Sequence, residues 1–331
     1  MAYSCKNKVA EDSLQDVITF DLGSKIKEEF KVLVDSEPAL KNLYQDQDTA
    51  MQIMQVMGKK LEVLLPSNIQ ETLREMGRTG EPGIIYLKGL PTDYYIPEKG
   101  GILERVNAKS KVSECLMLGL AYIMRCEVRP NNEQGGRIIH NIAPVNGLEN
   151  TFSSKGTEPF YLHTDNAYQE KVPDFVMMYS LVQDPDVSTS YYPISGFIES
   201  FPKDILESMK KKQFKIKSAP GYSEIEGIFA LLSEEEDIAQ NKKVRLRLYQ
   251  EPRGRIEAAS EEVGEEVQKV IQAVERILKP VNPKGISLKS GEAIIFNNGW
   301  GINKVGGVMH GRKGKIKNLQ RWLQRAFLFK R

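Results

Sequence analysis

The sequence predicts a mainly β fold with flanking helices, in which an antiparallel sandwich or barrel carries an N-terminal helical layer. Two features of the chain predict it. Up to about residue 80 the apolar side chains recur at helical spacing, whereas after residue 137 the chain consists of short strand-like runs bounded by turn residues. Helices do not alternate regularly with these runs, so a parallel sheet of βαβ units is not expected.

Helices are placed by apolar spacing and by the residues at their ends. Residues 38–75 and 102–125 carry apolar side chains on one helical face, many of them methionines in the first stretch. Two later helices are expected within the strand-rich part. One follows Pro202, and the other begins at Ser260 and stops at Lys279, where a proline follows.

Strands are expected where a short apolar or alternating run is bounded by turn residues. The first such run is Gly83–Leu90. The later runs, which form the expected β core, are Arg137–Val145, Phe160–Asp165, Phe175–Val182, Tyr191–Phe197, Gln213–Ser218, Val244–Tyr249, Ile286–Lys289, Ala293–Asn297 and Trp322–Phe329.

The 331 residues contain no repeat, low-complexity tract or linker. We therefore expect a single domain over 1–331, with a largely helical N-terminal layer at 1–130 and the β core at 131–331. Within the core, a lid insertion is expected at about 221–260. Its polar, acidic stretch at 221–240 is a candidate cover for a site, and a solvated surface loop is the alternative.

Composition excludes several classes of protein. Lys plus Arg (46) nearly balances Asp plus Glu (44), so no broad basic surface is expected and nucleic acid is not an expected partner. No run approaches the roughly 20 apolar residues that cross a bilayer, and the first residues lack the apolar core of a signal peptide, so we expect a cytoplasmic protein without a membrane partner. Three cysteines, Cys5, Cys115 and Cys126, fit neither a disulfide framework nor a zinc motif, and we expect them reduced.

Histidine is rare in this chain and therefore informative. The three histidines are His140, His163 and His310. His163 and Asp165 lie two apart at the end of an expected strand, where alternate residues point to the same side. A strand that carried His310 beside them would place two imidazoles and one carboxylate around an ion. Such a triad leaves coordination positions open, as a non-heme Fe(II) ion needs in order to hold a chelating cosubstrate and dioxygen.

Two arginines follow His310 on the last expected strand. Arg321 and Arg325 are four residues apart, so on a strand they share a face. Guanidinium groups that face inward from an apolar strand are costly to bury unless they meet anions, and their planar forks match carboxylates. A dicarboxylate beside the metal would supply such anions.

Together these motifs resemble a known family. The runs LHTD (162–165), GVMHGR (307–312) and QRWLQR (320–325) resemble the TauD/clavaminate synthase-like superfamily of Fe(II)/2-oxoglutarate dioxygenases, most closely its clavaminate synthase and arginine β-hydroxylase branch. The resemblance covers about residues 130–331 and implies a double-stranded β-helix, or jelly-roll, core. Asp165 stands where this branch often has Glu, and the run 311–320 is short for the branch.

The resemblance implies roles for individual residues. His163, Asp165 and His310 correspond to the catalytic iron ligands, and Arg321 to the partner of the distal carboxylate of 2-oxoglutarate. Thr189 matches the hydroxyl that joins this arginine, with its neighbours Ser188 and Ser190 as alternatives. Arg325 corresponds to a second arginine, near the oxoacid end of the cosubstrate or the carboxylate of a substrate. Because a carboxylate occupies position 165, hydroxylation or desaturation is expected and halogenation is not.

The resemblance also indicates the substrate. Positions that match substrate contacts in the amino-acid hydroxylases of the branch are His140, Ser153, Ser154 and either Glu251 or Glu257. The expected substrate is therefore a free, polar L-amino acid, and basic amino acids are included. Another small metabolite or a carrier-tethered amino acid is the alternative substrate. The sequence does not decide whether the protein forms a homodimer.

A non-catalytic jelly-roll protein that binds metal is the competing class. All three ligands and Arg321 are present together, which favours an enzyme. The sequence has no GxSxG nucleophile elbow, no GxxxxGK[ST] phosphate loop and no HExxH motif that would point to another chemistry.

Overall fold

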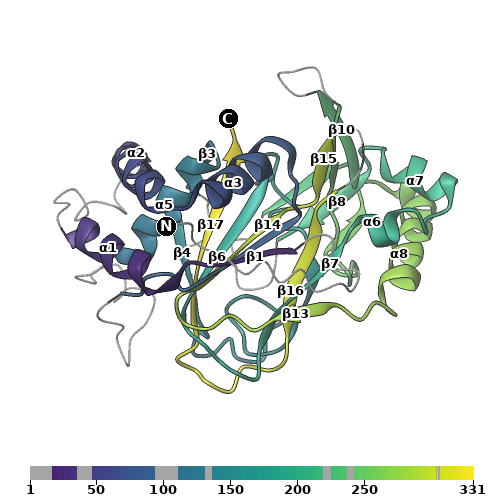
Figure 1. Cartoon of the computed structure of the whole chain (residues 1–331). Coiled ribbons are helices and arrows are strands. Elements are labelled where there is room, and N and C mark those ends of the chain that lie inside the picture. The colour runs from purple at the N-terminus through teal and green to yellow at the C-terminus, as the bar shows by residue number, and fades with distance from the viewer. Residues whose placement is uncertain are drawn as a thin grey trace.

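Two β-sheets packed face to face form the centre of the molecule, with helices at both ends (Figure 1). The computed structural model describes residues 17–35, 47–93, 111–130, 136–218, 225–236, 242–302, 304 and 306–331. The mainly β class with flanking helices is confirmed. Part of the first expected helix, at 38–46, and part of the second, at 102–110, lie outside the described residues.

The N-terminal part supplies helices and also strands. Its elements are β1 (Val17–Asp21), α1 (Gly23–Asp35), α2 (Gln47–Leu64), α3 (Ser67–Thr79), β2 (Ile84–Lys88), α5 (Val112–Ile123) and β3 (Cys126–Val128). Helix α3 ends where Gly80 adopts φ 85° and donates its N–H to the carbonyl of Met76, a left-handed cap that suits glycine. The sequence did not predict β1 or β3, so residues 1–130 are more than a helical layer.

A seven-stranded sheet joins both ends of the chain. Its order is β1-β2-β14-β6-β17-β3, and β4 also pairs with β17. The members not yet given are β4 (Ile139–Ile142), β6 (Phe175–Val182), β14 (Glu292–Asn297) and β17 (Trp322–Lys330). β1 is parallel to β2, whereas the β2–β14, β14–β6 and β6–β17 pairs are antiparallel. Four of the five residues of β1 (VITFD) are β-branched or aromatic and favour a strand, and the segment pairs with β2 over its whole length.

Both faces of this large sheet are buried. Alternate residues such as Ile85, Met177 and Ile295 pack against the N-terminal helices, which cover one face on the left of Figure 1. Their neighbours Ile84 and Met178 point to the opposite face and pack against the second sheet. Burial on both sides explains why these strands read as continuous apolar runs.

The second sheet has four strands in the order β13-β7-β16-β5. They are β5 (Phe160–His163), β7 (Ser188–Pro193), β13 (Lys284–Ile286) and β16 (Val308–Lys313). Tyr191 and Val308 from this sheet share a buried apolar cluster with residues of the large sheet. Two facing antiparallel sheets with this cluster between them form the jelly-roll core that the sequence predicted.

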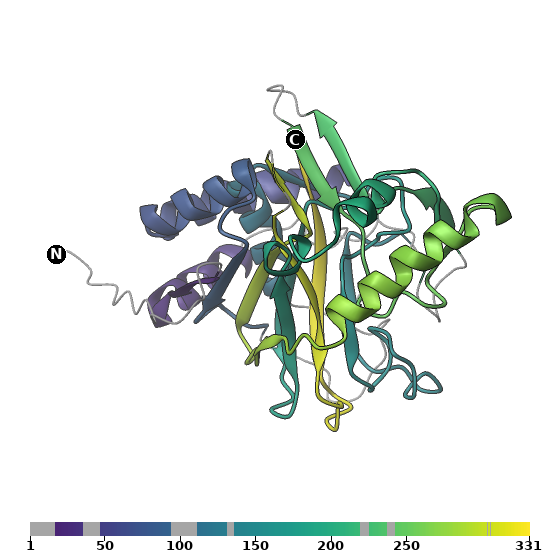
Figure 2. The same cartoon turned by 90° about the vertical axis from the view of Figure 1, so that its right-hand side faces the viewer.

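The remaining elements lie beside the small sheet, on the right of Figure 1. They are α6 (Ser195–Ile198), α7 (Lys203–Met209), β8 (Phe214–Lys217), β9 (Glu226–Phe229), β10 (Leu232–Glu236), β11 (Lys242–Leu246), β12 (Ile256–Ala258), a 3₁₀ turn (Glu261–Val263), α8 (Gly264–Leu278) and β15 (Trp300–Ile302). Figure 2 shows the long α8 beside α7, and the two helices share an apolar cluster with β8 and β11. Acidic residues in the first turn of α8 and Arg276 in its last turn complement the helix dipole.

Most expected strands are confirmed, and several boundaries differ. The run Tyr191–Phe197 was too late: the strand is Ser188–Pro193, and Phe197 lies in α6. The strand expected at Ile286–Lys289 is Lys284–Ile286, because that segment pairs with β7. The glycine-rich stretch around Trp300, which is not among the expected strands, includes β15, which pairs with β11.

The expected lid loop contains regular structure where it is described. β9 pairs with β8, and β10 pairs with β11 in an antiparallel ladder. The acidic side chain of Glu234 in β10 forms ion pairs with Lys210 and Lys242. Residues 221–224 and 237–240 lie outside the described residues, and a covering role for this segment stays a prediction.

Two further expectations concern cysteine and the membrane. Cys115 and Cys126 are buried, and no disulfide joins them to a described residue, whereas Cys5 lies outside the described residues. Within the described part of the chain, every helix is too short or too polar to span a membrane.

Candidate metal centre

The two histidines of the expected triad face each other across neighbouring strands. His163 is the last residue of β5, and His310 in β16 is its direct antiparallel partner. Gly311 follows His310, and a Cβ there would lie 2.3 Å from the carbonyl oxygen of Phe160. Glycine at 311 therefore lets β16 approach β5 closely enough to bring the two imidazoles together.

The carboxylate reaches the same point by a different route from the one expected. β5 ends at His163, and Asp165 lies in the turn that follows, so strand alternation does not place it. The side chain of Asn298 holds this turn: its Oδ1 accepts from Asp165 N at 2.8 Å, and its Nδ2 donates to Asp165 O at 3.1 Å. The next residue, Asn166, has φ 55°, which reverses the chain.

The three side chains form one compact group of possible metal ligands. Asp165 Oδ2 lies 2.6 Å from His310 Nε2, and Asp165 Oδ1 lies 3.8 Å from His163 Nε2. All three side chains are buried. Adjacent ligands about 2.1 Å from an ion stand roughly 3 Å apart, so these separations fit a divalent metal.

Neighbouring groups set the orientation of each ring. His163 Nδ1 donates to the carbonyl of Tyr161 at 2.8 Å, which leaves the Nε2 lone pair toward Asp165. His310 lies against the ring of Phe296, with centroids 5.0 Å apart and planes 7° from parallel. Its Nδ1 is buried and has no hydrogen-bond partner among the described residues, so packing rather than hydrogen bonding holds this ring.

The protonation states suit metal binding. Burial alone would raise the pKa of Asp165, but His310 and Arg325 outweigh it and hold that pKa well below its usual range. Burial, followed by the neighbouring His310, lowers the pKa of His163 to about 3. At neutral pH the carboxyl is therefore ionised and the His163 ring is neutral, which is the form in which each binds a metal.

An inner cavity begins at the two histidines and runs between the sheets. Its lining includes His163, His310, Thr189, Arg321 and Arg325. Arg321 is 6% exposed, and among the described residues its side chain forms no ion pair. Burial lowers its pKa to about 10, and Asp184 acts on it only from a distance, so the guanidinium stays charged at neutral pH. A buried cation without an ion-pair partner among the described residues thus lines this cavity.

The three candidate hydroxyls for the cosubstrate lie on opposite faces of β7, because successive strand residues point to opposite sides. Thr189 in β7 is buried and lines the inner cavity, opposite Arg312 of β16. Ser188 and Ser190 lie on the other face of β7, and neither lines this cavity. Of the three alternatives, Thr189 alone lies where it can act together with Arg321.

Arg325 and His140 lie behind the carboxylate. Arg325 Nη1 donates to Asp165 Oδ1 at 3.2 Å, and its Nη2 donates to His140 Nδ1 at 3.3 Å. His140 in turn donates from Nε2 to the carbonyl of Arg137 at 2.9 Å. Burial and then Arg325 lower the pKa of His140 to about 3, so the ring is neutral. His140 lines neither cavity beside the triad and supports Arg325 instead.

An outer cavity of about 400 Å³ lies on the other side of His163. It shares His163 and Phe160 with the inner cavity, so the two are neighbours across one wall. Its lining includes Phe152, Tyr161, Tyr249, Glu251, Arg253 and Arg255. No described residue of 225–236 lines either cavity.

Of the four other residues expected to contact substrate, two line a cavity beside the triad and two do not. Ser154 lines the inner cavity and Glu251 the outer one. The Ser153 hydroxyl bonds within its own loop, to the hydroxyl of Thr151 at 2.9 Å. Glu257 lies in β12, where it accepts from Lys217 Nζ at 2.6 Å, and it lines neither cavity.

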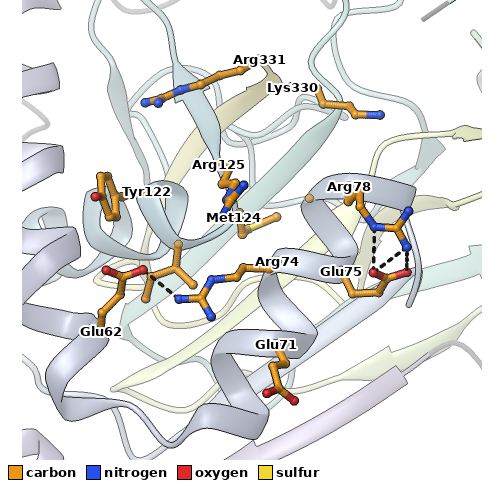
Figure 3. A pocket seen from close by; sticks show the side chains of 12 residues that line it. Glu62, Glu71, Arg74, Glu75, Arg78, Tyr122, Met124, Arg125, Lys330 and Arg331 are labelled. Carbon is orange, nitrogen blue, oxygen red and sulfur yellow. Dashed lines mark hydrogen bonds and ion pairs between the residues drawn. The ribbon is translucent and has the colours of Figure 1, made fainter. Parts of the chain in front are cut away.

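A hollow of about 890 Å³, larger than the outer cavity, lies elsewhere, beside α3 and the C-terminus (Figure 3). Two pairs of its charged side chains form ion pairs, Arg74 with Glu62 and Arg78 with Glu75. It contains none of the three histidines. Size therefore does not identify the site, whereas the convergence of metal-binding side chains does.

Reasoning from the sequence missed three residues that position the triad: Asn298, Phe296 and Tyr249. Tyr249 stacks on His163 with centroids 6.5 Å apart and planes 17° from parallel. Asn298 carried one signal, because it follows a polar residue at the end of an otherwise apolar strand. The contacts of the two aromatic rings depend on packing between strands far apart in sequence.

Known proteins resemble this chain in part of its sequence and in its fold. No protein-family model matches the chain. One curated enzyme, the L-asparagine oxygenase of Streptomyces coelicolor, is 28% identical over 122 residues. That match spans 36% of this chain and 37% of the length of the enzyme.

Solved structures match over nearly the whole chain. Asparagine oxygenase in complex with Fe(II), 2S,3S-3-hydroxyasparagine and succinate aligns with a TM-score of 0.70 at 20% identity, covering 95% of this chain and 94% of that one. This chain has the same fold as that enzyme. OrfP, a non-heme iron oxygenase in complex with Fe and α-ketoglutaric acid, aligns with a TM-score of 0.67 at 14% identity and covers 95% of each chain. The fold implied by the resemblance to the clavaminate synthase-like branch is thereby confirmed.

Proposed function

We propose that this protein is an Fe(II)/2-oxoglutarate-dependent dioxygenase that hydroxylates an unactivated C–H bond of a free, polar L-amino acid. The observation that carries the proposal is the buried group of His163, Asp165 and His310 beside a cavity that contains the uncompensated cation Arg321. A metal site with open positions next to a carboxylate-binding site suits a chelating oxoacid cosubstrate.

The donor set fits Fe(II). Two imidazole nitrogens and one carboxylate are the ligands of non-heme iron sites that keep positions open for cosubstrate and oxygen. His163 Nε2, His310 Nε2 and the Asp165 carboxylate would hold the ion. Bound there with 2-oxoglutarate and dioxygen, iron would supply the oxidising chemistry, converting the oxoacid to succinate and carbon dioxide.

The protein side chains would bind and orient the cosubstrate. The planar fork of Arg321 suits the distal carboxylate of 2-oxoglutarate, and the Thr189 hydroxyl can donate a further hydrogen bond to it. Arg325 holds the Asp165 carboxylate from behind. Met178 and Leu323 give the cavity apolar walls that exclude water and strengthen these charge interactions.

The outer cavity is the proposed substrate site. It adjoins His163, and Glu251 lies in its lining. The relatives support an amino acid as substrate, because asparagine oxygenase is solved with hydroxyasparagine and OrfP with (3S)-hydroxy-L-Arg. A cytoplasmic location, a small-molecule substrate without nucleic acid or membrane as partner, and a homodimer stay predictions.

Turnover across a panel of amino acids tests the proposal. Purified protein with Fe(II), 2-oxoglutarate and air is expected to release succinate faster when the correct L-amino acid is added, and to yield a product heavier by one oxygen. The Asp165→Ala variant serves as the inactive control. If no amino acid stimulates succinate release although iron and 2-oxoglutarate bind, the amino-acid substrate is wrong. If 2-oxoglutarate does not bind either, the dioxygenase assignment fails.

A further inference from the structure

The outer cavity contains one arginine whose charge the protein does not neutralise. Arg255 is half-buried, and its Nε donates to the carbonyl of Lys217 at 3.2 Å. Within the described ranges, no carboxylate lies at ion-pair distance from it. The other cations around the two cavities have partners of their own or a role already assigned.

The other arginines around the two cavities are already engaged or have a proposed ligand. Arg253 lines the same cavity, but Glu275 accepts from its Nε at 2.5 Å and from its Nη2 at 2.9 Å. Arg312 donates to backbone carbonyls, including that of Gly156 at 2.9 Å. Arg325 is engaged with Asp165 and His140. Arg321 lies in the inner cavity, where the cosubstrate is proposed to bind.

Arg255 is also held at a fixed place relative to the triad. Its guanidinium carbon lies 4.2 Å from the centroid of the Tyr249 ring, and that ring in turn stacks on His163. The backbone of Tyr249 forms a β-bridge with His163. A stack of guanidinium, phenol and imidazole therefore sets the distance between the Arg255 charge and the metal-binding face.

Glu251 provides a complementary charge in the same cavity. It lies near the phenol of Tyr161, whose pKa is raised by burial first and then by this carboxylate. No cation lies at ion-pair distance from Glu251 in the part of the chain that the structure describes, so Glu251 and Arg255 do not neutralise each other. A cavity that keeps an acid and a guanidinium apart suits a ligand with an ammonium and a carboxylate.

From this geometry we infer that Arg255 is a specificity-determining residue that binds a carboxylate of the substrate in the outer cavity. The inference rests on the proposed function, since it concerns the substrate of the same site. The carboxylate can be the one on the α-carbon or one on the side chain, and both present the same two oxygens to the guanidinium fork.

Binding without turnover tests the inference. Calorimetry under anaerobic conditions, with and without Fe(II) and 2-oxoglutarate, is run with L-Asp, L-Asn, L-Glu, L-Gln, L-Arg and L-Lys and with the α-amide of each. The wild type is expected to bind at least one free acid and to bind its α-amide, or its side-chain amide, at least about 10-fold more weakly. The amide that loses affinity identifies which carboxylate meets Arg255.

Variants assign this preference to the residue. Arg255→Gln is expected to weaken binding of the preferred acid about 10- to 100-fold and to bind acid and amide equally, because the charge-assisted pair is gone. Arg255→Lys should restore part of the affinity, since it keeps the charge but not the fork. Arg253→Gln is the matched control, because that arginine lines the same cavity but is paired with Glu275, and its effect should stay below about 3-fold. Melting temperatures of all variants separate binding losses from misfolding.

Three results would overturn the role of Arg255 in binding the substrate carboxylate. If Arg255→Gln keeps the acid-over-amide preference, or if Arg253→Gln loses it equally, Arg255 is not the carboxylate partner. A wild type that binds none of the acids also overturns the inference. Since binding needs no turnover, loss of acid binding in Arg255→Gln would support the inference even if succinate release failed and the proposed dioxygenase function with it.

Discussion

Asp165 and Asp174 are two buried aspartates nine residues apart, and their surroundings differ. Asp174 is 4% exposed, and Arg245 Nη2 at 2.5 Å, Lys243 Nζ and the backbone N–H of Lys330 all donate to its carboxylate. Asp165 is 5% exposed and meets one cation, Arg325, and two imidazoles. The protein supplies both cations that neutralise Asp174. At Asp165 it supplies nitrogen lone pairs, which an added metal ion can complement.

The comparison separates a carboxylate buried for stability from one buried for chemistry. Burial costs each carboxylate its hydration, and the cost must be offset by charges or hydrogen bonds. The pKa of Asp174 is lowered even though burial alone would raise it, because Arg245 and Lys243 outweigh the burial. Imidazole nitrogens next to a carboxylate are therefore the feature that marks the metal centre, whereas a depressed carboxyl pKa is common to both sites.

The largest effect is expected from removing a ligand. His163→Ala or His310→Ala should abolish the visible charge-transfer band that Fe(II) and 2-oxoglutarate give together, and should lower turnover by at least about 1,000-fold, because two ligands hold iron far less tightly than three. Anaerobic absorption spectra and succinate assays measure both quantities. A normal band in either variant would remove that histidine from the metal site.

Removing the charge of Asp174 should lower the stability of the protein and leave iron binding unchanged. Asp174→Asn leaves two buried cations, Lys243 and Arg245, without their anion, and should lower the free energy of unfolding by about 3–5 kcal/mol. Urea unfolding measures this loss. Iron binding by the folded variant should match the wild type, and a loss of iron binding without a loss of stability would erase the distinction between the two carboxylates.

Arg321→Ala should weaken the cosubstrate site. Loss of one member of a desolvated ion pair should raise the 2-oxoglutarate concentration needed for half-maximal turnover by about 10- to 1,000-fold, with little change in iron affinity. Arg321→Lys should recover part of this loss because it restores only a point charge. If Arg325→Ala raises the 2-oxoglutarate requirement instead, the two arginines have exchanged roles.

A smaller effect is expected from removing the hydroxyl of Thr189. Thr189→Val keeps the shape of the side chain and removes one hydrogen bond to a charged ligand, which should raise the 2-oxoglutarate requirement about 10-fold. Ser190→Ala is the control on the opposite face of β7. Equal effects of the two variants on steady-state kinetics would contradict the assignment of Thr189.

The mildest expected effect is a pH dependence of stability. Because the folded-state pKa of Asp174 is lowered, its contribution is complete above the unfolded value of about 4 and is lost as pH falls through the folded value. The wild type should therefore lose stability in acid, and Asp174→Asn should show a shallower loss over the same range. Parallel acid slopes in thermal unfolding of the two proteins would contradict the role given to Arg245 and Lys243.

Local patterns predicted the features that depend on nearby residues. The runs around His163, His310 and Arg321 are short motifs whose chemistry is visible in the sequence, and strands such as β6 read as apolar because both of their faces are buried. Strand alternation, once β7 was placed at 188–193, was sufficient to choose Thr189. The fold class and the grouping of the triad therefore required little information beyond the sequence.

The features that sequence reasoning missed depend on partners far apart in the chain. β1 pairs with β2 at a large sequence separation, and Asn298 holds Asp165 across 133 residues. His140 was expected at the substrate but lies behind Arg325, because β4 pairs with β17 in that register. Glu257 forms a surface ion pair with Lys217 for a similar reason, since β12 and β8 are neighbours.

The central claim is that Asp165, and not Asp174, is the carboxylate of an iron site. Anaerobic titration of the wild type, Asp165→Ala and Asp174→Asn with Fe(II) in the presence of 2-oxoglutarate tests it most directly. We expect a saturating charge-transfer band at a single equivalent of iron for the wild type and for folded Asp174→Asn, and loss of tight binding in Asp165→Ala. Equal iron affinity in the wild type and Asp165→Ala would contradict it.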